Sequence, residues 1–259
     1  MKHPSSPVSI IQGAPAILEA IGRGESLEKI YMLRTASGEK IGAIRQQARR
    51  AAIPISWVPA EKLRKLCRGF EGEALALGAL VEYQDLESLI SQVQNRGQIP
   101  LLALLDGVTD TRNLGAIGRS LYGCGGHGLI LPTSSSAAIT SDSVIASAHT
   151  LSQLPIARVP SVAQGIDLLR QHGIQVLASD RQGARPVHEL DLRSPTCFIL
   201  GSEDKGIGKE SRRMADQLVH IPMGSDLDSF NVSVAAGMFF YETMMQRDFG
   251  LGRKPAEKV

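Results

Sequence analysis

Short apolar runs recur along the sequence from residue 99 onward, and polar, amphipathic stretches separate them. The runs read IPLLALLD, GLILP, PIARV, IQVLAS, CFILGS and QLVHIP. Runs of this length suit buried strands, and the amphipathic stretches between them suit helices. Strands that alternate with helices in this way form a mostly parallel sheet with helices on both faces. We therefore predict an α/β fold for this part of the chain.

The front of the sequence alternates in the same manner on a smaller scale. Helices are predicted through AILEAI, EKIGAIRQQARRAA and AEKLRKLC, and strands at KIYML, ISWV and near ALGALVEY. A polar stretch at residues 84–98 follows and is predicted to be helical. A chain of 259 residues has room for two domains. We divide it into an N-terminal domain at 1–83, a linker at 84–98 and a second domain at 99–259.

Positive charge is concentrated in the first domain. Residues 1–70 hold 12 Lys and Arg against 5 Asp and Glu, whereas residues 71–259 hold 16 against 21. Such an excess suits a surface that meets a polyanion, because phosphate contacts supply most non-specific nucleic-acid affinity. A solvated, charged helix face explains it nearly as well. Aromatic residues make up 4% of the chain, which argues against broad base-stacking platforms.

Several classes of protein are disfavoured by composition. No apolar stretch approaches the roughly 18 residues of a membrane span, and the first residues do not resemble a secretion signal, so we expect a cytoplasmic protein. The six histidines lack metal-ligand spacing, so no metal site is predicted. The cysteines are too few and too scattered for a disulfide framework or a structural zinc site: Cys67, Cys124 and Cys197.

The stretch Gly123 to Gly128 satisfies the pattern G-x-G-x-x-G, which would suggest a dinucleotide-binding domain and a nicotinamide-dependent dehydrogenase. That fingerprint requires a strand before the glycines and a helix after them. Here a helix is predicted to end at Tyr122 and a strand to begin near Leu129. We interpret these glycines as a helix end followed by a tight turn.

Three other segments share one design, in which an apolar strand gives way to a polar, glycine-bearing loop that opens a helix. They read LLDGVTDTRNLGAIGRS, FILGSEDKGIG and HIPMGSDLDSFNVSVAAG. In parallel α/β sheets, the loops beyond the carboxyl ends of strands are where ligands bind. The three loops are therefore predicted to form one pocket.

Each loop contains polar residues that allow a functional and a structural interpretation. Asn113 at a helix start is either functional or an N-cap. Arg119 lies among small and apolar neighbours, where a guanidinium needs an anionic partner, which favours a functional role. Glu203 either acts in the pocket or interacts with the dipole of the following helix.

The third loop carries its own candidates. Ser229 and Asn231 flank Phe230 at the start of an apolar helix, and Ser229 could be its cap. Asp226 and Asp228 could be imagined as metal ligands together with Glu203, but nothing fixes such a geometry. A polar loop is the preferred interpretation.

Taken together, the motifs resemble those of a known family. The segments N-L-G-A-I-G-R-S at 113–120, L-G-S-E-D-K-G-I at 200–207 and I-P-M-G-S-D-L-D-S-F-N-V-S-V-A at 221–235 are similar to the three motifs of the SpoU (TrmH-like) RNA 2'-O-ribose methyltransferases of the SPOUT superfamily. The resemblance covers residues 99–247. The first domain more loosely resembles the small ribosomal-protein-like RNA-binding domain that often precedes this catalytic domain.

The resemblance implies a fold and a cofactor. It implies a deep trefoil knot near residues 199–206, 220–225 and 229–235, which hydrophobic pattern alone does not predict. The cofactor would be S-adenosylmethionine, and the chain would act as a homodimer. Cofactor-binding residues would be Leu200, Gly201, Ile221, Met223, Phe230 and Asn231.

It also implies a reaction, the attack of a ribose 2'-hydroxyl on the cofactor's methyl group, which depends on alignment. Arg119 would orient and polarise the hydroxyl, since a guanidinium is a poor base. Asn113 and Glu203 would hold Arg119, and Ser229 with Asn231 would position the nucleophile or the methionine end. RNA contacts in the first domain would come from the basic helix: Arg45, Arg49 and Arg50.

Some positions depart from the family pattern. Pro15 stands where histidine is common, Phe70 and Glu71 stand where His-Gln often precedes glycine, and SAHTLSQLP at 147–155 lacks the usual glycine and glutamate. These departures concern the RNA target, for which large-subunit ribosomal RNA is our first choice and transfer RNA the second. The alternative function is a non-catalytic RNA-binding or ribosome-assembly factor with the same fold.

Overall fold

The computed structural model describes residues 10–133, 135–225 and 229–248. The positions of Asp226 and Asp228, considered above as metal ligands, lie outside the described residues. By internal contacts the chain forms two compact units. The first comprises the chain up to Tyr83 together with Ala138–Ser141, and the second comprises the remainder.

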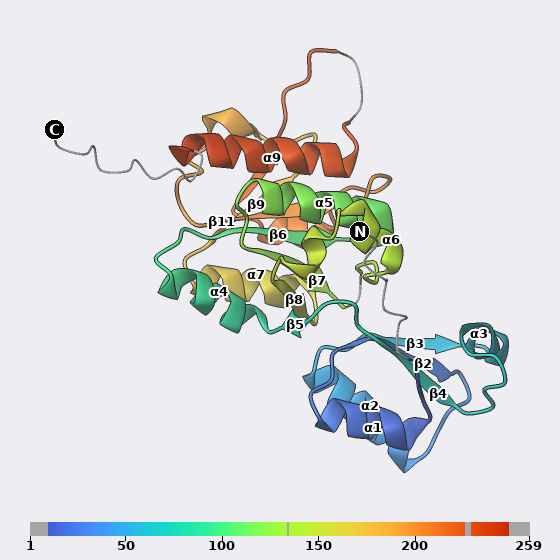
Figure 1. Ribbon diagram of the computed structural model, residues 1–259. Helices are drawn as coiled ribbons and strands as arrows, with labels where there is room; N and C mark the ends of the chain where they lie inside the picture. Colours follow the sequence, from blue (N-terminus) through green and yellow to red (C-terminus); the bar gives the residue numbers. More distant parts are fainter. Residues whose placement is uncertain (1–9, 134, 226–228, 249–259) are drawn as a thin grey trace. The chain divides into compact units, whose positions relative to one another are not determined.

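The first unit is a four-stranded sheet with three helices (Figure 1). Its strand order is β1-β4-β2-β3; β4 pairs antiparallel with β1 and β2, and β2 pairs parallel with β3. The strands are β1 (Ile10–Gln12), β2 (Leu27–Leu33), β3 (Ile55–Val58) and β4 (Ala74–Gly78). The helices are α1 (Ala14–Gly22), α2 (Glu39–Arg50) and α3 (Ala60–Leu66).

Both faces of this small sheet carry apolar side chains, because alternate residues of a strand point to opposite sides. Ile30 and Met32 of β2 belong to a core cluster with residues of α1 and α2. Tyr31 and Leu33 pack on the other cluster, around Leu63 of α3. Helices α1 and α2 therefore cover one face and α3 covers the other.

The second unit is built on an eight-stranded sheet in the order β10-β12-β9-β11-β6-β7-β8-β5. Every adjacent pair from β10 to β8 is parallel, so the expected mostly parallel α/β sheet is confirmed. The strands are β5 (Tyr83–Gln84), β6 (Leu101–Asp106), β7 (Gly128–Pro132), β8 (Ile156–Val159), β9 (Gln175–Ser179), β10 (Arg185–Pro186), β11 (Thr196–Gly201) and β12 (Gln217–His220).

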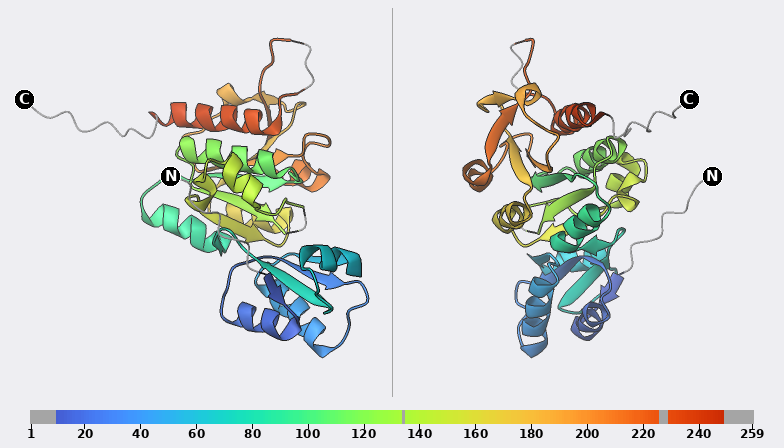
Figure 2. Two further views of the ribbon diagram at one scale, coloured as in Figure 1. Left: turned by 45° about the vertical axis from the view of Figure 1, so that its right-hand side comes forward. Right: turned by 90° about the vertical axis from the view of Figure 1, so that its left-hand side faces the viewer.

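Helices cover this sheet on both sides. Figure 1 shows α5 and α9 on one face and α4 and α7 on the other, and the views of Figure 2 show the same layers. The helices are α4 (Leu86–Asn95), α5 (Thr111–Gly123), α6 (Ser141–Ala146), α7 (Val162–Gln171), α8 (Lys209–Met214) and α9 (Val232–Gln246), with short 3-10 turns at Thr150–Ser152 and Val187–Glu189. No described helix is long and apolar enough to cross a membrane.

Helix α4 occupies most of the polar stretch at residues 84–98. Its side chains Leu86, Leu89, Ile90 and Val93 are buried in the same core cluster as the central strands. The helix is amphipathic, with apolar residues at the spacing of one helical face. The stretch is thus an integral part of the second unit.

Two predicted helix starts were wrong. Helix α5 begins at Thr111, and its N-cap is Asp110, whose carboxylate accepts a hydrogen bond from the Arg112 backbone N–H at 2.7 Å. Helix α9 begins at Val232, and its N-cap is Asn231. Asn113 and Ser229 are therefore not caps, because in each case another side chain accepts from the first free N–H groups.

The glycine-rich stretch after α5 is a turn, as predicted. The helix ends at Gly123, Gly125 has a φ of 71°, and β7 begins at Gly128. The order of helix, glycines and strand is the reverse of a dinucleotide-binding fingerprint.

Candidate active site

The carboxyl ends of four parallel strands, β6, β9, β11 and β12, lie at one edge of the second sheet. Asp106, the last residue of β6, joins two of the following segments. Its carboxylate accepts from the Gly208 N–H at 2.7 Å and from the Ser211 hydroxyl at 2.5 Å. This carboxylate fixes the start of α8 against the end of β6.

The loop after β11 turns tightly at the same edge. Ser202 and Gly206 exchange two backbone hydrogen bonds, of 3.0 and 2.9 Å, and Gly206 has a φ of 64°. A Cβ on Gly201 would lie 2.1 Å from the carbonyl carbon of Gly206, so only glycine fits there. The close approach lets the loop fold back and present Glu203.

A hydrogen-bonded triad connects the three motif loops. The Asn113 amide donates to Glu203 Oε1 at 3.0 Å, and the Asn231 amide donates to the same oxygen. Asn231 also donates to Asn113 Oδ1 at 3.2 Å. These residues are 90 and 118 positions apart from Asn113 along the chain. The predicted convergence of the three loops is thus present in the structure at the level of side chains.

Arg119 does not join this triad. The side chain is exposed, and it has no hydrogen bond or ion pair to any residue that the structure describes. A helix turns about 100° per residue, so Arg119 lies about 120° around α5 from Asn113. The argument that its small and apolar neighbours leave the guanidinium in need of an anionic partner was wrong, because Ile117, Gly118 and Leu121 lie on the buried face of α5, about 100° or more around the helix from Arg119.

Two adjoining cavities open at this edge of the sheet, and Glu203 lines the smaller of them. One has a volume of about 280 Å³ and the other about 650 Å³. They have a common wall consisting of Ser179, Asp180, Arg181, Gln182, Ser229, Phe230 and Ala235. We call the two together the cleft. Its size lies in the range of pockets that hold a nucleoside-sized ligand.

Most of the residues predicted for the pocket line this cleft. Gly201 and Glu203 line the smaller cavity, Ile221 and Met223 the larger, and Ser229 and Phe230 both. Four others do not line it: Leu200 is fully buried within β11, Arg119 lies on the exposed side of α5, and Asn113 and Asn231 contact Glu203, which does line it. The basic residues Arg45, Arg49 and Arg50 are exposed on α2 in the first unit.

Sequence reasoning missed the loop after β9. Asp180 is buried, forms an ion pair with Arg212 of α8, and accepts from the Gln182 N–H at 2.9 Å. A signal was available, because the strand IQVLAS also leads into a polar, glycine-bearing loop, DRQG. No motif marked that loop, so it was passed over.

The cleft combines apolar and polar walls. Phe230, Ile221 and Met223 offer apolar surface, and the buried Asp180 and the hydroxyl of Ser179 are hydrogen-bonding groups. Within residues 10–133, 135–225 and 229–248, no group of three or more His, Cys, Asp and Glu side chains could hold a metal ion. The arrangement suits binding and alignment of an elongated ligand with an apolar ring and polar ends.

Comparison with known protein families covers both units. The model described as the SpoU rRNA Methylase family matches residues 100–241. The model described as RNA 2'-O ribose methyltransferase substrate binding matches residues 10–71. The first match alone spans more than half of the chain and includes every residue of the triad and every residue that lines the cleft.

Individual relatives extend over nearly the whole chain. YacO of Bacillus subtilis, named as a TrmH family tRNA/rRNA methyltransferase, is 28% identical over 236 residues, 91% of this chain and 95% of that protein. An uncharacterized tRNA/rRNA methyltransferase of Mycolicibacterium vanbaalenii is 31% identical over 240 residues, 92% of this chain and 76% of that protein. The solved structure of the SpoU methyltransferase AviRb from Streptomyces viridochromogenes, in complex with AdoMet, has 26% identity and a TM-score of 0.59, covering 94% of this chain and 92% of that one.

Proposed function

The chain belongs to the SpoU (TrmH) family of S-adenosylmethionine-dependent RNA methyltransferases, and from this premise we propose that it methylates a ribose 2'-hydroxyl in RNA. The observation that carries the proposal is the triad of Asn113, Glu203 and Asn231, which joins the three motif loops beside a cleft of suitable size. The mostly parallel sheet is the α/β SPOUT fold of that family.

The cleft fits S-adenosylmethionine, the cofactor of this family. Its apolar wall of Ile221, Met223 and Phe230 suits an adenine ring, and the loops containing Gly201 and Ser229 suit the polar methionine end. When bound, the cofactor supplies an activated methyl group. Leu200 would contribute through its backbone, because its side chain points into the core.

The protein's remaining task is to hold the 2'-hydroxyl in line with the methyl group, which is mainly a matter of positioning. The hydroxyl proton would pass to solvent as the oxygen–methyl bond forms and the sulfur–methyl bond breaks. We assign the orienting and polarising role to Arg119, with a substrate phosphate as its partner. Glu203 receives two amide donors, so its carboxylate is fixed and holds Asn231 in place. Ser229 and Asn231 would position the nucleophile or the methionine end.

A homodimer is supported by a row of exposed apolar side chains on the outer face of α9. The row consists of Val234, Met238, Tyr241 and Met245, with exposed fractions of 47%, 37%, 51% and 44%. The spacing follows one face of the helix, and large exposed apolar patches mark interaction sites. We propose a second copy of this chain as the occupant, and sedimentation of the Tyr241→Glu variant as a monomer would support it.

The trefoil knot is proposed for residues 199–206, 220–225 and 229–235. It is supported by the convergence of all three segments on one cleft. The chain passes from β11 to β12, on the far side of β9 in the sheet, and then returns to α9, which packs against α5. An experimental structure with the cofactor bound, traced through these segments, tests the threading.

For the RNA target, we propose large-subunit ribosomal RNA first and transfer RNA second. Residues 1–83 would bind the RNA and residues 99–259 would carry out the transfer. Support for the first role comes from the matched substrate-binding model and from the exposed arginines of α2: Arg45, Arg49 and Arg50.

Two experiments test the function. Calorimetry should show binding of S-adenosylmethionine and of S-adenosylhomocysteine. If neither binds, the enzyme hypothesis fails, and the alternative of a non-catalytic RNA-binding or assembly factor is favoured. Nucleoside mass spectrometry of RNA from cells with and without the gene should identify one missing methylated nucleotide and its RNA.

The position of the methyl group needs its own measurement. A ribose whose 2'-oxygen is methylated lacks the nucleophile for alkaline cleavage of the next phosphodiester, so the modified site should resist alkali. A methylated base at the same position would leave the cleavage intact and would contradict the ribose assignment.

A further inference from the structure

The first unit exposes the single tryptophan of the sequence. Trp57 lies on β3, the edge strand of the four-stranded sheet, and 41% of its surface is accessible. An exposed large aromatic ring leaves apolar surface in water, which is a common feature of recognition sites. The ring is held in register, because Trp57 pairs with Met32 of the neighbouring strand.

Trp57 lies on the face of the sheet that α2 covers. Ile55, two residues earlier and thus on the same face, packs against the core cluster of α1 and α2. The guanidinium of Arg45, on α2, lies over the Trp57 ring at 5.9 Å from its centroid. A cation placed in this way is attracted by the ring and keeps the two planar groups together.

Arg49 follows Arg45 by one helical turn, so the two arginines share a face of α2. Both are exposed, and among the described residues neither forms an ion pair. Two uncompensated guanidinium groups beside an exposed indole combine the features that bind single-stranded RNA: a π surface for a base and cations for the backbone phosphates.

We propose that Trp57 and Arg45 form a stacking site for one unpaired RNA base, with Arg45 and Arg49 contacting the phosphates next to it. The site rests on the proposed function in that the ligand is the RNA substrate. The proposed site agrees with the low aromatic content of the chain, because stacking one base requires a single ring and not a broad aromatic surface. Paired RNA is excluded as the ligand of this site, because a base within a duplex has no free face to stack on an isolated ring.

The single tryptophan makes the site directly observable. We expect a short single-stranded oligoribonucleotide to quench the fluorescence of the full-length wild-type protein in a saturable manner, because a base stacked on the indole ring quenches its emission. A duplex of the same sequence and inorganic polyphosphate should leave the fluorescence unchanged. Quenching by polyphosphate to the same extent would overturn the stacking site.

Variants separate stacking from charge. Trp57→Ala should weaken binding of a labelled single-stranded oligoribonucleotide by about five- to a hundredfold in fluorescence anisotropy, the range of one stacked base. Trp57→Phe should retain part of the affinity. Unfolding temperatures of both variants should be close to that of the wild type.

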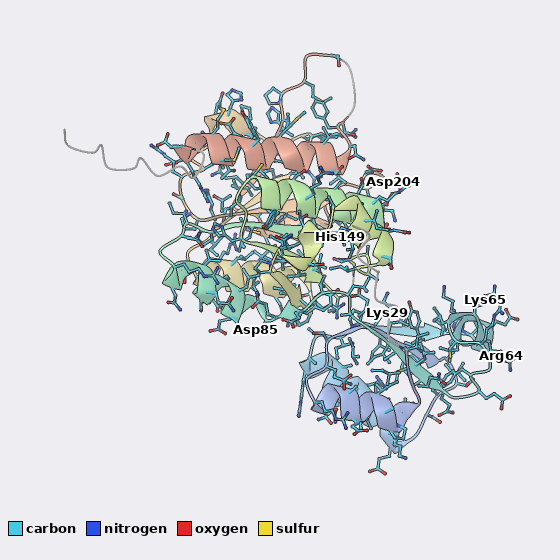
Figure 3. The ribbon with its side chains drawn as sticks, viewed as in Figure 1. Lys29, Arg64, Lys65, Asp85, His149 and Asp204 are labelled. Carbon is cyan, nitrogen blue, oxygen red and sulfur yellow. The ribbon has the colours of Figure 1, made fainter. Side chains whose placement is uncertain are left out.

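Helix α3 provides a matched charge control. Arg64 and Lys65 project from it (Figure 3), and α3 packs on the opposite face of the sheet from α2. The double variant Arg64→Ala, Lys65→Ala removes as much charge as Arg45→Ala, Arg49→Ala, but it should leave the quenching in place. Only the α2 pair should abolish it. Equal effects of the two pairs would show a diffuse charge effect and contradict the proposal.

The outcome is separable from that of the proposed function. Cofactor binding and alkali-resistant methylation are measured on the second unit's chemistry and do not depend on Trp57 fluorescence. If wild-type methyl transfer is observed but single-stranded RNA gives no quenching, the stacking site fails and the enzymatic function stands.

Discussion

The side chain of Asn231 has two roles, one at each end of its amide. Its oxygen accepts from the Ser233 N–H at 2.9 Å and caps α9, whereas its nitrogen donates to Glu203 and Asn113. The cap is a requirement of the helix, and the donation is a requirement of the site. From the sequence, Asn231 was predicted only as a site residue, and Ser229 was considered as the cap.

The Asn231→Asp variant should separate the two roles. Asp is as good an N-cap as Asn, so the unfolding temperature should change little. The variant loses the amide donor and places a second carboxylate against Glu203, which should displace both groups. Since small displacements in an aligned site cost up to about a hundredfold in rate, we expect single-turnover methyl transfer to fall by about tenfold or more.

A second substitution provides the control. In the double variant Asn231→Asp, Glu203→Gln, the introduced glutamine amide can donate to the introduced aspartate carboxylate, which reverses the polarity of the pair. Part of the lost rate should return, and a double-mutant cycle measures the coupling. If the two losses are simply multiplied, the contact between these side chains does not support catalysis.

At the scale of the elements, Arg247 anchors the end of α9. Its guanidinium donates to the carbonyls of Leu192, Ile99, Pro100 and Ser194 at 2.8, 2.8, 3.1 and 2.7 Å. These carbonyls precede β11 and β6, so one side chain holds the last helix to the starts of two central strands. Burial lowers the pKa of Arg247 to about 10, and the group remains charged at neutral pH.

Replacing Arg247 by Lys should therefore be destabilising. A lysine ammonium is a compact donor that cannot reach carbonyls spread around a planar fork, and each lost hydrogen bond to a charged group costs about 1.5–3 kcal/mol. We expect the free energy of unfolding in urea to fall by about 2 kcal/mol or more. Arg193→Lys is the control, because the side chain of Arg193 pairs, among the described residues, only with the exposed Asp191 two positions earlier. Equal losses in both variants would contradict the anchoring role.

The turn that contains His127 makes stability depend on pH. Its Nδ1 accepts from the Leu101 N–H at 3.1 Å, at the start of β6. Burial, assisted by the charges of Arg247 and Arg96, lowers its pKa from 6.5. The unfolded chain therefore binds the proton more readily than the folded one. This contribution to stability is fully present above pH 6.5 and declines as the pH falls toward the lowered folded-state pKa.

The His127→Asn variant should reduce this dependence. An Asn Oδ1 can accept from Leu101 but does not titrate, so the decline of unfolding free energy below pH 6.5 should be shallower than in the wild type. Urea unfolding at a series of pH values measures it. Parallel pH profiles for the two proteins would show that another group is responsible.

The fold could be predicted because local pattern determines most of it. Runs such as CFILGS became buried parallel strands, and the glycines before β7 became a turn because a helix precedes them. Helix starts were less predictable. Asp110 and Asn231 displaced Asn113 and Ser229 as caps, since several capping residues occur together and the choice depends on which one the backbone presents.

For the molecule as a whole, the convergence of three loops followed from one rule, that the carboxyl ends of parallel strands share an edge. The loop that contains the buried Asp180 obeys the same rule, but no motif marked it. The ion pair of Asp180 with Arg212, which lies in a different element further along the chain, could not be predicted from the sequence. The predicted environment of Arg119 was wrong for a different reason. Sequence neighbours on a helix point in different directions, so apolar neighbours do not bury a residue.

The exposed position of Arg119 leads to a prediction about the assembled protein. Arg119 has no partner among the described residues of its own chain, and it lies on the exposed side of α5 together with Tyr122, which is 41% exposed. Helix α5 packs beside α9, whose outer row we propose as the dimer contact. We therefore expect Arg119 to act in the cleft of the partner copy.

Two impaired variants should then complement each other. In a mixed dimer of Arg119→Ala and Asn231→Asp chains, one cleft combines an intact Arg119 from one copy with an intact Asn231 from the other, and the second cleft carries both lesions. Mixed dimers of a symmetric assembly, purified through two different tags, should therefore recover about half of wild-type methyl transfer. If Arg119 instead acts within its own chain, every cleft carries one lesion, and the methyl-transfer rate of the mixed dimers stays between the rates of the two parent variants. Both variants keep the apolar row and the N-cap of α9, so dimer formation and folding should be unchanged. A difference in methyl transfer therefore reports only which copy supplies Arg119.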